Sequence, residues 1–522
     1  MAFTNGSATD YRDLLLKLDL FITNKHLSVV AVNAGGSSYI AGDILTVAGG
    51  TVQGSMTAQI EVLTVDGGGA VLTARVSNSG AYSVDPTVTA NAVTGGTGSS
   101  ATMDLTMLIT GWTQRMKNLS SAPITSFIEI NEYDIIDDGS GYGVGDTITW
   151  SAPGATTAAT FLVASVISGN VTSLSIVSHG TYTAITGSTY GTTTGGSGTG
   201  LTLQCEFRPV RDEYFWEGSG TGGNSVYVGI RTAYAVADEQ VSWELAGFTG
   251  WQSGQDWENQ AGITDGRCVL ATSGEQVGGP AVLLETSAMD YWIYANTRRI
   301  IMVIHVGASY QSLHMGLCDP FGTDTEIPYP MYICGTSDKF TEDIGDGAMW
   351  LRGPSDPMQG DLVGDGNAGL FRDGAGVWNK VRNGYYDGSD ITSDDRDGYW
   401  VYPCGSIKDE IYIAIPAIDD FVTTYGLRWE DIIKNTRSGT PSYRWKPSPD
   451  SGGNKYFPIP CTVMLTSTDV RRAVAEVNGV FWVSAEEGLS VNDRIINSGR
   501  YFRVFQMGAN AVSYSHFCVE EK

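Results

Sequence analysis

The chain has 522 residues, with 31 Lys and Arg against 57 Asp and Glu, which gives a formal net charge of −26 at pH 7. Hydrophobic residues make up 42% and charged residues 17%, which is too apolar for a disordered chain and too sparsely charged for a coiled coil. The negative charge repels phosphate backbones, so nucleic acid is not an expected partner. The 66 glycines follow no triplet period, and glycine turns between short β-branched runs predict a mainly β protein.

The seven cysteines are scattered and include no C-x-x-C pair, which argues against a disulfide framework and a zinc ribbon. We therefore expect reduced thiols in a protein made in a cytoplasm. The first residues, MAFTNGSATDYRD, lack the basic and apolar regions of a signal peptide. No run of 18 apolar residues occurs, so no membrane span is expected.

The first predicted element is a helix over residues 10–23. Its apolar positions recur at the helical period, and Ser7 or Thr9 is expected to cap its N-terminus. The stripe consists of Leu14, Leu18, Phe21 and Ile22.

Three sequence blocks occur twice in the same order. GSSYIAGDILT (36–46) matches GSGYGVGDTIT (139–149), and two later blocks, 71–82 and 94–107, match 171–182 and 194–207. The first pair is separated by 103 residues and the other two pairs by 100. This order and spacing predict two similar β modules, module 1 at 29–108 and module 2 at 124–207.

We expect the modules to be inserted into one discontinuous β-rich core domain. Residues 1–28 supply its N-terminal helix, and residues 109–123 connect the modules as a short helix or an extended linker. Residues 208–522 form the main part of this core. An Asp- and Gly-rich excursion is expected at 337–400.

The repeated Gly-x-x-Tyr-x-x-Gly-Asp block is interpreted as a turn that sets the register of a following strand. Its glycines supply backbone angles that a Cβ would forbid, its aspartate forms an Asx turn with the following backbone, and its tyrosine covers the turn. A second turn in each module ends in a tyrosine. The predicted structural turn residues are Gly36, Tyr39, Gly42, Asp43, Gly139, Tyr142, Gly145, Asp146, Tyr82 and Tyr182.

Two binding alternatives for these turns remain open. Aromatic faces bind sugars, so the four tyrosines are also candidates for a glycan site. Asp43 and Asp146 are weaker candidates for Ca²⁺, because one carboxylate per turn falls far short of six to eight oxygen ligands.

Beyond residue 207 the pattern predicts further strands, one helix and two hairpin turns. The helix is expected at Leu427–Asn435, and the turns at Val477–Val480 and Asn497–Gly499. The expected strands lie at 213–216, 226–234, 240–246, 298–306 and 411–418.

No catalytic motif is present, so no catalytic residue, cofactor or metal is predicted. Glu213 and Glu244 are the carboxylate pair that a glycosidase would need if they met in space. The five histidines have no ligand spacing, and Trp243, Trp251 and Trp257 suit either a core or an interface. A loose Ca²⁺ site is a weak alternative at Asp387, Asp390, Asp394, Asp395 and Asp397.

Several segments together resemble virion structural proteins of tailed bacteriophages. The opening AFTNGSATDYRDLLLKLDLFIT is followed by a Gly-Trp-Thr at 111–113, by VYVGIRTAY, WELAGFTGW and YWIYANTRRIIMVIHVGASYQSLHMG, and by EVNGVFWVSAEEGLSVNDRI and YFRVFQM. The resemblance covers roughly residues 1–27, 109–117 and 208–522. The modules follow Leu27 and Lys117, where such proteins usually run straight through, and similar Gly-Tyr-x-x-Gly-Asp modules occur in phage tail, baseplate and fibre proteins.

This resemblance implies a non-enzymatic virion component, belonging to the tail or baseplate, that acts in assembly. Its expected partners are other virion proteins and copies of itself in a symmetric oligomer. A receptor- or glycan-binding tail protein that contacts host surface glycan, a capsule depolymerase and a bacterial adhesin are the competing interpretations.

Overall fold

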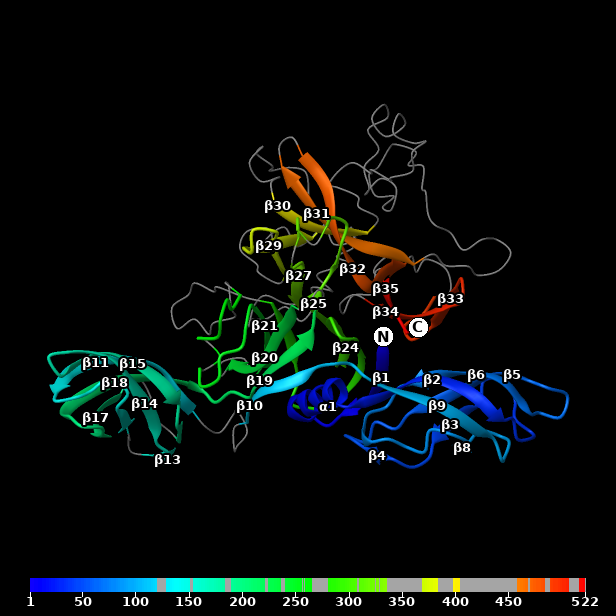
Figure 1. The fold of residues 1–522 in the computed structure, drawn as a ribbon, viewed down its shortest axis with the longest axis horizontal. Helices are drawn as coiled ribbons and strands as arrows, with labels where there is room; N and C mark the ends of the chain where they lie inside the picture. The colour runs from blue at the N-terminus through cyan, green and yellow to red at the C-terminus, as the bar shows by residue number, and fades with distance from the viewer. Residues whose placement is uncertain are drawn as a thin grey trace.

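The computed structural model confirms the predicted fold class: the described part of the chain is mainly β, with one helix near its N-terminus and several antiparallel sheets (Figure 1). The structure describes residues 1–119, 128–150, 154–183, 189–220, 224–235, 240–255, 257, 259–264, 280–307, 309–323, 325–327, 329–335, 369–383, 398–403, 458–467, 470–483, 489–506 and 516–521.

The core domain is built on two sheets whose apolar side chains form one buried cluster with those of the helix. The larger sheet has 14 described strands, and its order begins β1-β23-β24-β25, with β1 paired to β23. Its strands are β1 (Ala2–Ala8), β23 (Met289–Ala295), β24 (Arg299–Val306), β25 (Ser309–Leu317), β26 (Asp319–Pro320), β27 (Met331–Gly335), β28 (Gly369–Arg372), β29 (Trp378–Asn383), β30 (Gly398–Pro403), β31 (Ile459–Ser467), β32 (Val470–Val483), β33 (Arg494–Asn497), β34 (Arg500–Gln506) and β35 (His516–Glu520).

The smaller core sheet has five strands and joins segments that are distant in the sequence. Its order is β10-β19-β20-β21-β22, so the segment between the two modules pairs directly with strands that follow module 2. The strands are β10 (Thr113–Asn118), β19 (Glu213–Ser219), β20 (Ser225–Ala235), β21 (Gln240–Phe248) and β22 (Ala281–Leu284).

The helix α1 (Tyr11–Thr23) lies on this core, and its predicted apolar stripe is confirmed. Leu14, Leu18, Phe21 and Ile22 are fully buried among side chains of both sheets. The predicted caps, Ser7 and Thr9, are wrong. Asp10 is the N-cap instead, and its Oδ1 accepts hydrogen bonds from the backbone N–H groups of Arg12 (2.8 Å) and Asp13 (2.9 Å).

The two modules have the same topology. The order of module 1 is β4-β7-β2-β9-β8-β3-β5-β6, and that of module 2, β13-β16-β11-β18-β17-β12-β14-β15, matches it strand for strand. Module 1 contains β2 (Lys25–Ala34), β3 (Ile44–Val47), β4 (Thr51–Val52), β5 (Gln59–Val65), β6 (Val71–Asn78), β7 (Tyr82–Val84), β8 (Asn91–Gly95) and β9 (Thr102–Ile109). Module 2 contains β11 (Ile128–Ser140), β12 (Thr147–Trp150), β13 (Ala155–Thr157), β14 (Ala159–Ile167), β15 (Asn170–Ser178), β16 (Thr181–Tyr182), β17 (Thr189–Gly195) and β18 (Thr199–Pro209).

The modules are placed differently on the core. Module 1 lies beneath the core beside α1 and the C-terminal strands, whereas module 2 stands out at the opposite end of the molecule (Figure 1). The apolar interior of module 2 consists of its own residues. Module 1, by contrast, also contributes Met56 and Ala81 to the core cluster around α1.

The structure confirms most of the predicted strands and one of the two predicted hairpin turns. The segment 113–118 is a strand rather than a short helix, because its backbone pairs with β19. Strands are confirmed at 213–216, 226–234, 240–246 and 298–306. The turn at Asn497–Gly499 is also confirmed, with Ser498 and Gly499 both at positive φ between β33 and β34.

The predicted turn at Val477–Val480 is wrong, since β32 runs through it. Asn478 donates a side-chain hydrogen bond to Asp319, and the carbonyl of Asn478 accepts one from Arg299 Nη1 at 3.0 Å. Gly479, at φ +96°, forms an irregularity in a long strand that pairs with β31 on both sides of it.

The helix predicted at Leu427–Asn435 and the strand at 411–418 lie outside the described residues. Within the predicted excursion at 337–400, residues 369–383 belong to the larger core sheet through β28 and β29. Among the described residues, no helix has the length and apolar character needed to cross a bilayer.

Candidate functional site: the module turns and the docking interface

The Gly-Tyr turn of module 1 is a tightly packed structure rather than an open loop. Tyr39 is buried, and its ring lies on two glycines from different segments. A Cβ on Gly98 would lie 2.5 Å from Tyr39 Cγ, and one on Gly36 would lie 2.9 Å from Tyr39 Cε2. Only glycine lets the ring lie this close, so the tyrosine and the glycines specify each other.

Module 2 repeats this arrangement at the matching positions. Tyr142 is buried, a Cβ on Gly198 would lie 2.5 Å from Tyr142 Cγ, and one on Gly139 would lie 2.8 Å from Tyr142 Cε2. Gly42 and Gly145 share the same φ of +93° with open space around them. Backbone conformation, not space, therefore requires glycine at these last two positions.

The aspartate of each turn bonds differently from the predicted Asx turn. Asp43 Oδ2 accepts from the backbone N–H of Ile40 (3.0 Å), which precedes it, and from the N–H (3.0 Å) and Oγ1 (2.7 Å) of Thr97. These hydrogen bonds, with the backbone of Ile40 first, lower the pKa of Asp43. The carboxylate thus latches the first glycine turn to the distant Thr-Gly-Gly loop at 94–98.

Asp146 forms the same latch in module 2. Its Oδ2 accepts from the backbone N–H of Gly143 (2.9 Å) and from the N–H (2.9 Å) and Oγ (2.6 Å) of Ser197. Its pKa is lowered by these bonds, the one from Gly143 first. One carboxylate oxygen therefore accepts three hydrogen bonds from the protein, as in module 1.

The second tyrosine of each module also has a fixed partner. The hydroxyl of Tyr82 accepts from the N–H of Ala58, and that of Tyr182 from the N–H of Ala159, both at 2.9 Å. Burial raises the pKa of Tyr182 to about 12. Because all four predicted turn tyrosines are buried, their rings offer no face for stacking on a sugar, and the glycan alternative fails at these positions.

The structure brings Glu213 and Glu244 close together, on either side of the Arg231 guanidinium. Arg231 lies between them in register on β20, and all three side chains are buried. Arg231 Nη2 lies 2.7 Å from Glu244 Oε2, and Arg231 Nη1 lies 3.9 Å from Glu213 Oε1. The guanidinium also packs 5.5 Å from the centre of the Trp257 ring. This is an internal ion pair rather than the open acid and base of a glycosidase.

The remaining candidates have packing positions or lie outside the described residues. Trp243 and Trp257 are fully buried core residues, and Trp251 is half-buried against Phe215. Among the described residues no group of His, Cys, Asp or Glu side chains is arranged to hold a metal ion. The acidic positions of 387–397 are not among the described residues.

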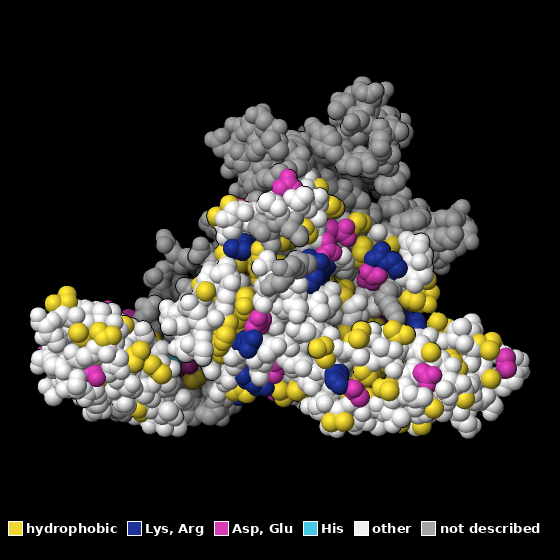
Figure 2. Space-filling view, in the orientation of Figure 1, with side chains coloured by type: hydrophobic (Ala, Val, Ile, Leu, Met, Phe, Trp, Pro, Cys, Tyr) yellow, Lys and Arg dark blue, Asp and Glu magenta, His cyan; other side chains and the backbone are white. Residues whose placement is uncertain are grey.

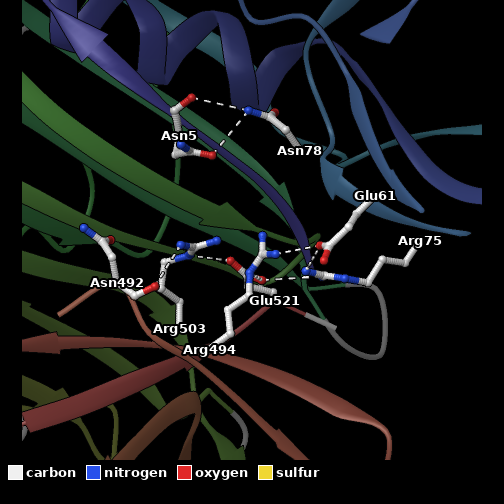
Figure 3. A network of polar contacts seen from close by, with 8 residues as sticks. All are labelled: Asn5, Glu61, Arg75, Asn78, Asn492, Arg494, Arg503 and Glu521. Carbon is white, nitrogen blue, oxygen red and sulfur yellow. Dashed lines mark hydrogen bonds and ion pairs between the residues drawn. The ribbon is translucent and has the colours of Figure 1, made fainter. Parts of the chain in front are cut away.

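The sequence did not predict the polar network that docks module 1 on the core (Figure 3). Glu61 Oε2, on β5, lies 2.6 Å from Arg75 Nη2 and 2.7 Å from Arg494 Nη1. The fully buried Glu521 side chain lies 2.6 Å from Arg503 Nε, 3.1 Å from Arg494 Nε and 3.6 Å from Arg75 Nη1. Arg75 and Arg494 therefore each contact one carboxylate of module 1 and one of the C-terminal segment.

The network holds three guanidinium groups and two carboxylates, and its burial affects the two core arginines differently. Burial is the largest influence on Arg494 and lowers its pKa, against the attraction of Glu521. Burial is also the largest single influence on Arg503 and acts to lower its pKa, but the combined effects of Glu521, Tyr294 and Glu61 raise it. Charged groups in such an enclosed site stabilise a structure only when they are well paired. Removing one member of the network would leave the others without full compensation of their charge.

Backbone and amide contacts extend the same interface. The N–H of Ser79 donates to the carbonyl of Phe3 at 2.7 Å, and Ser79 Oγ accepts from the N–H of Phe3 at 3.2 Å. Asn78 Nδ2 donates to the carbonyl of Asn5 at 3.3 Å. Module 1 is thus tied to β1 as well as to the C-terminal strands.

Module 2 has different residues at the docking positions. Glu61 and Leu162 are equivalent, since each pairs with the residue that follows the latch aspartate. Their partners across the next strand pair, Arg75 and Ser175, are equivalent too. The Leu162 side chain is 38% exposed. The sequence signal for this interface is a difference between the repeats. Module 1 has charged residues at two positions where module 2 has neutral residues.

No protein-family model and no curated protein matches this chain.

Proposed function

We propose that the protein is a structural component of a bacteriophage virion, belonging to its tail or baseplate, and that it acts in particle assembly. The sequence resemblance described above suggests this class of protein. The structural observation that supports it is the pair of equivalent β modules, one joined to the core by an ion-pair network and the other projecting away from it (Figures 1 and 3).

This arrangement suits assembly because one module is fixed to the core while the other projects from it. Module 1, β1, α1 and the C-terminal strands share buried contacts and act as one body. Module 2 has the same fold without the docking charges, so its surfaces are available to neighbouring proteins. In a symmetric particle, each copy would present this module to the same neighbour.

Mass spectrometry of purified phage particles, with and without detached tails, tests the proposal. We expect peptides of this chain in whole particles and in the tail fraction, in a fixed ratio to known tail proteins. Absence from purified particles, with the protein found only in the lysate, would overturn it. Recovery with tail-free heads would overturn the assignment to tail or baseplate.

A further inference from the structure

The outer face of three strands in module 2 combines carboxylates with exposed apolar groups. Asp134 on β11 pairs with Gln204 on β18, which pairs in turn with Tyr190 on β17, so the three residues form one row across the sheet. Tyr190 is 66% exposed and Ile136 is 52% exposed. Asp134, Asp137 and Glu206 are exposed as well. We call these strands' outer surface the acidic face.

The charge on this face is not balanced within the module. Strands β11, β17 and β18 contain six acidic residues and one basic residue, Arg208, and no blue side chain lies on module 2 in the view of Figure 2. Glu132 is directly opposite Glu206 in the register of β11 and β18.

Module 1 is the natural comparison, because the same positions there are small and mostly neutral. Val29, Ala31 and Thr106 stand where module 2 has Glu132, Asp134 and Glu206. The one carboxylate of this face in module 1, Asp104, is bonded internally, accepting from the N–H of Ala90 at 2.8 Å and from Asn33 Nδ2 at 3.2 Å. The repeats therefore share their interior and turns but differ on this face. Because module 1 has the same fold without these acidic residues, folding does not require the face to be acidic.

We propose that the acidic face docks on a basic surface of another protein, whose Lys and Arg side chains pair with Asp134, Asp137 and Glu206 while Tyr190 and Ile136 pack between them. Carboxylates around an exposed aromatic ring attract cations both by charge and through the ring face. Phosphate and anionic glycan would be repelled. A second copy of this chain, with a net charge of −26, is a poorer electrostatic match than a basic neighbour.

The inference rests on the proposed function in one respect: the neighbour is expected to be another protein of the same particle. Carbodiimide coupling of purified particles, followed by mass spectrometry, tests it, because this reagent joins a carboxylate to a lysine amine without a spacer. Residues 130–207 contain no lysine, so every link formed by the acidic face must lead outside the module.

We expect links from Asp134, Asp137 or Glu206 to lysines of one other particle protein, lost at high salt before coupling. If the chain is present in particles but these carboxylates form no links, or link only to lysines of this chain, the inference is wrong and the proposed function stands. If the chain is absent from particles, the proposed function fails first.

Variants provide a second readout. The variant Asp134→Asn/Asp137→Asn/Glu206→Gln, alone and with Tyr190→Ser, should enter particles roughly tenfold less well than the unaltered protein, since charge complementarity guides docking. The matched control, Asp66→Asn/Asp85→Asn/Asp104→Asn, removes three acidic residues from module 1 and should enter normally. Circular dichroism and thermal unfolding establish that each variant folds. Equal incorporation of both folded variants would overturn the inference.

Discussion

The guanidinium of Arg75 lies over the ring of Tyr501, with Cζ 4.2 Å from the ring centre. Arg75 belongs to module 1 and Tyr501 to β34 of the core, so this contact joins an inserted repeat to the end of the chain. It lies beside the ion pairs of Arg75 with Glu61 and Glu521. One arginine therefore makes aromatic and ionic contacts across the same interface, and module 2 has a serine in its place.

The variant Arg75→Ser, which introduces the residue of module 2, should lower the free energy of unfolding by about 3–5 kcal/mol, because it leaves the buried Glu521 and the partly buried Glu61 with fewer partners. Urea unfolding measures the change. Arg115→Ser provides the control, since Arg115 pairs with Glu217 at an exposed site and its loss should cost less than about 1 kcal/mol. Equal effects of the two substitutions would contradict the docking role of Arg75.

The substitutions Gly98→Ala and Gly198→Ala should each destabilise their module by about 2 kcal/mol or more, because the new Cβ would overlap a buried tyrosine ring. Thermal unfolding followed by calorimetry detects this. Gly67→Ala is the control, since open space surrounds Gly67 and its φ is not positive. A tolerated Gly98→Ala would show that the ring does not need this glycine.

The latch aspartates predict an acid-sensitive turn. The folded-state pKa values of Asp43 and Asp146 lie below the unfolded value. Their stabilising contribution is therefore complete above about pH 5 and is lost as the pH falls through the folded-state pKa. Hydrogen exchange of peptides spanning 140–150 should accelerate as the pH falls from about 5 toward 2, after correction for intrinsic rates.

In Asp146→Asn this pH dependence should be weaker and exchange should be faster at neutral pH. Asp138→Asn, on the exposed part of β11, is the matched control and should leave both unchanged. An unaltered acid profile in Asp146→Asn would rule out the latch as its source.

The variant Arg231→Met should destabilise the core by about 3–5 kcal/mol, since it removes the buried guanidinium that lies between Glu213 and Glu244. The further change of Glu244→Gln in the same chain should recover part of this loss. A double-mutant cycle in urea measures the coupling. Additive effects would show that the three groups do not act as one buried unit.

Much of the module architecture is predictable because its determinants are local and are repeated. The glycines at positive φ and the covering tyrosines lie within ten residues of each other. The latch partners Thr97 and Ser197 are about 50 residues from their aspartates, so the local pattern indicates the aspartates but not these partners. A local pattern also failed where distant groups compete, as at Asn478, which contacts Asp319 and Arg299.

The docking interface depends on residues that are far apart in sequence. Glu61 and Arg494 are separated by 433 positions, and no local period relates them. Their chemistry is common, since the chain has many charged residues. Only the comparison with the neutral residues Leu162 and Ser175 of module 2 distinguishes Glu61 and Arg75 from other charged residues. The strand topology is needed to interpret this difference as a docking interface.

Electron cryomicroscopy of purified particles tests the central claim most directly, because it would show both modules in their assembled positions. We predict density for this chain in the tail or baseplate, with module 1 held against the C-terminal strands and the outer face of β11, β18 and β17 seated on a different protein. Particles without this chain, or module 2 packed on its own core through that face, would contradict the account.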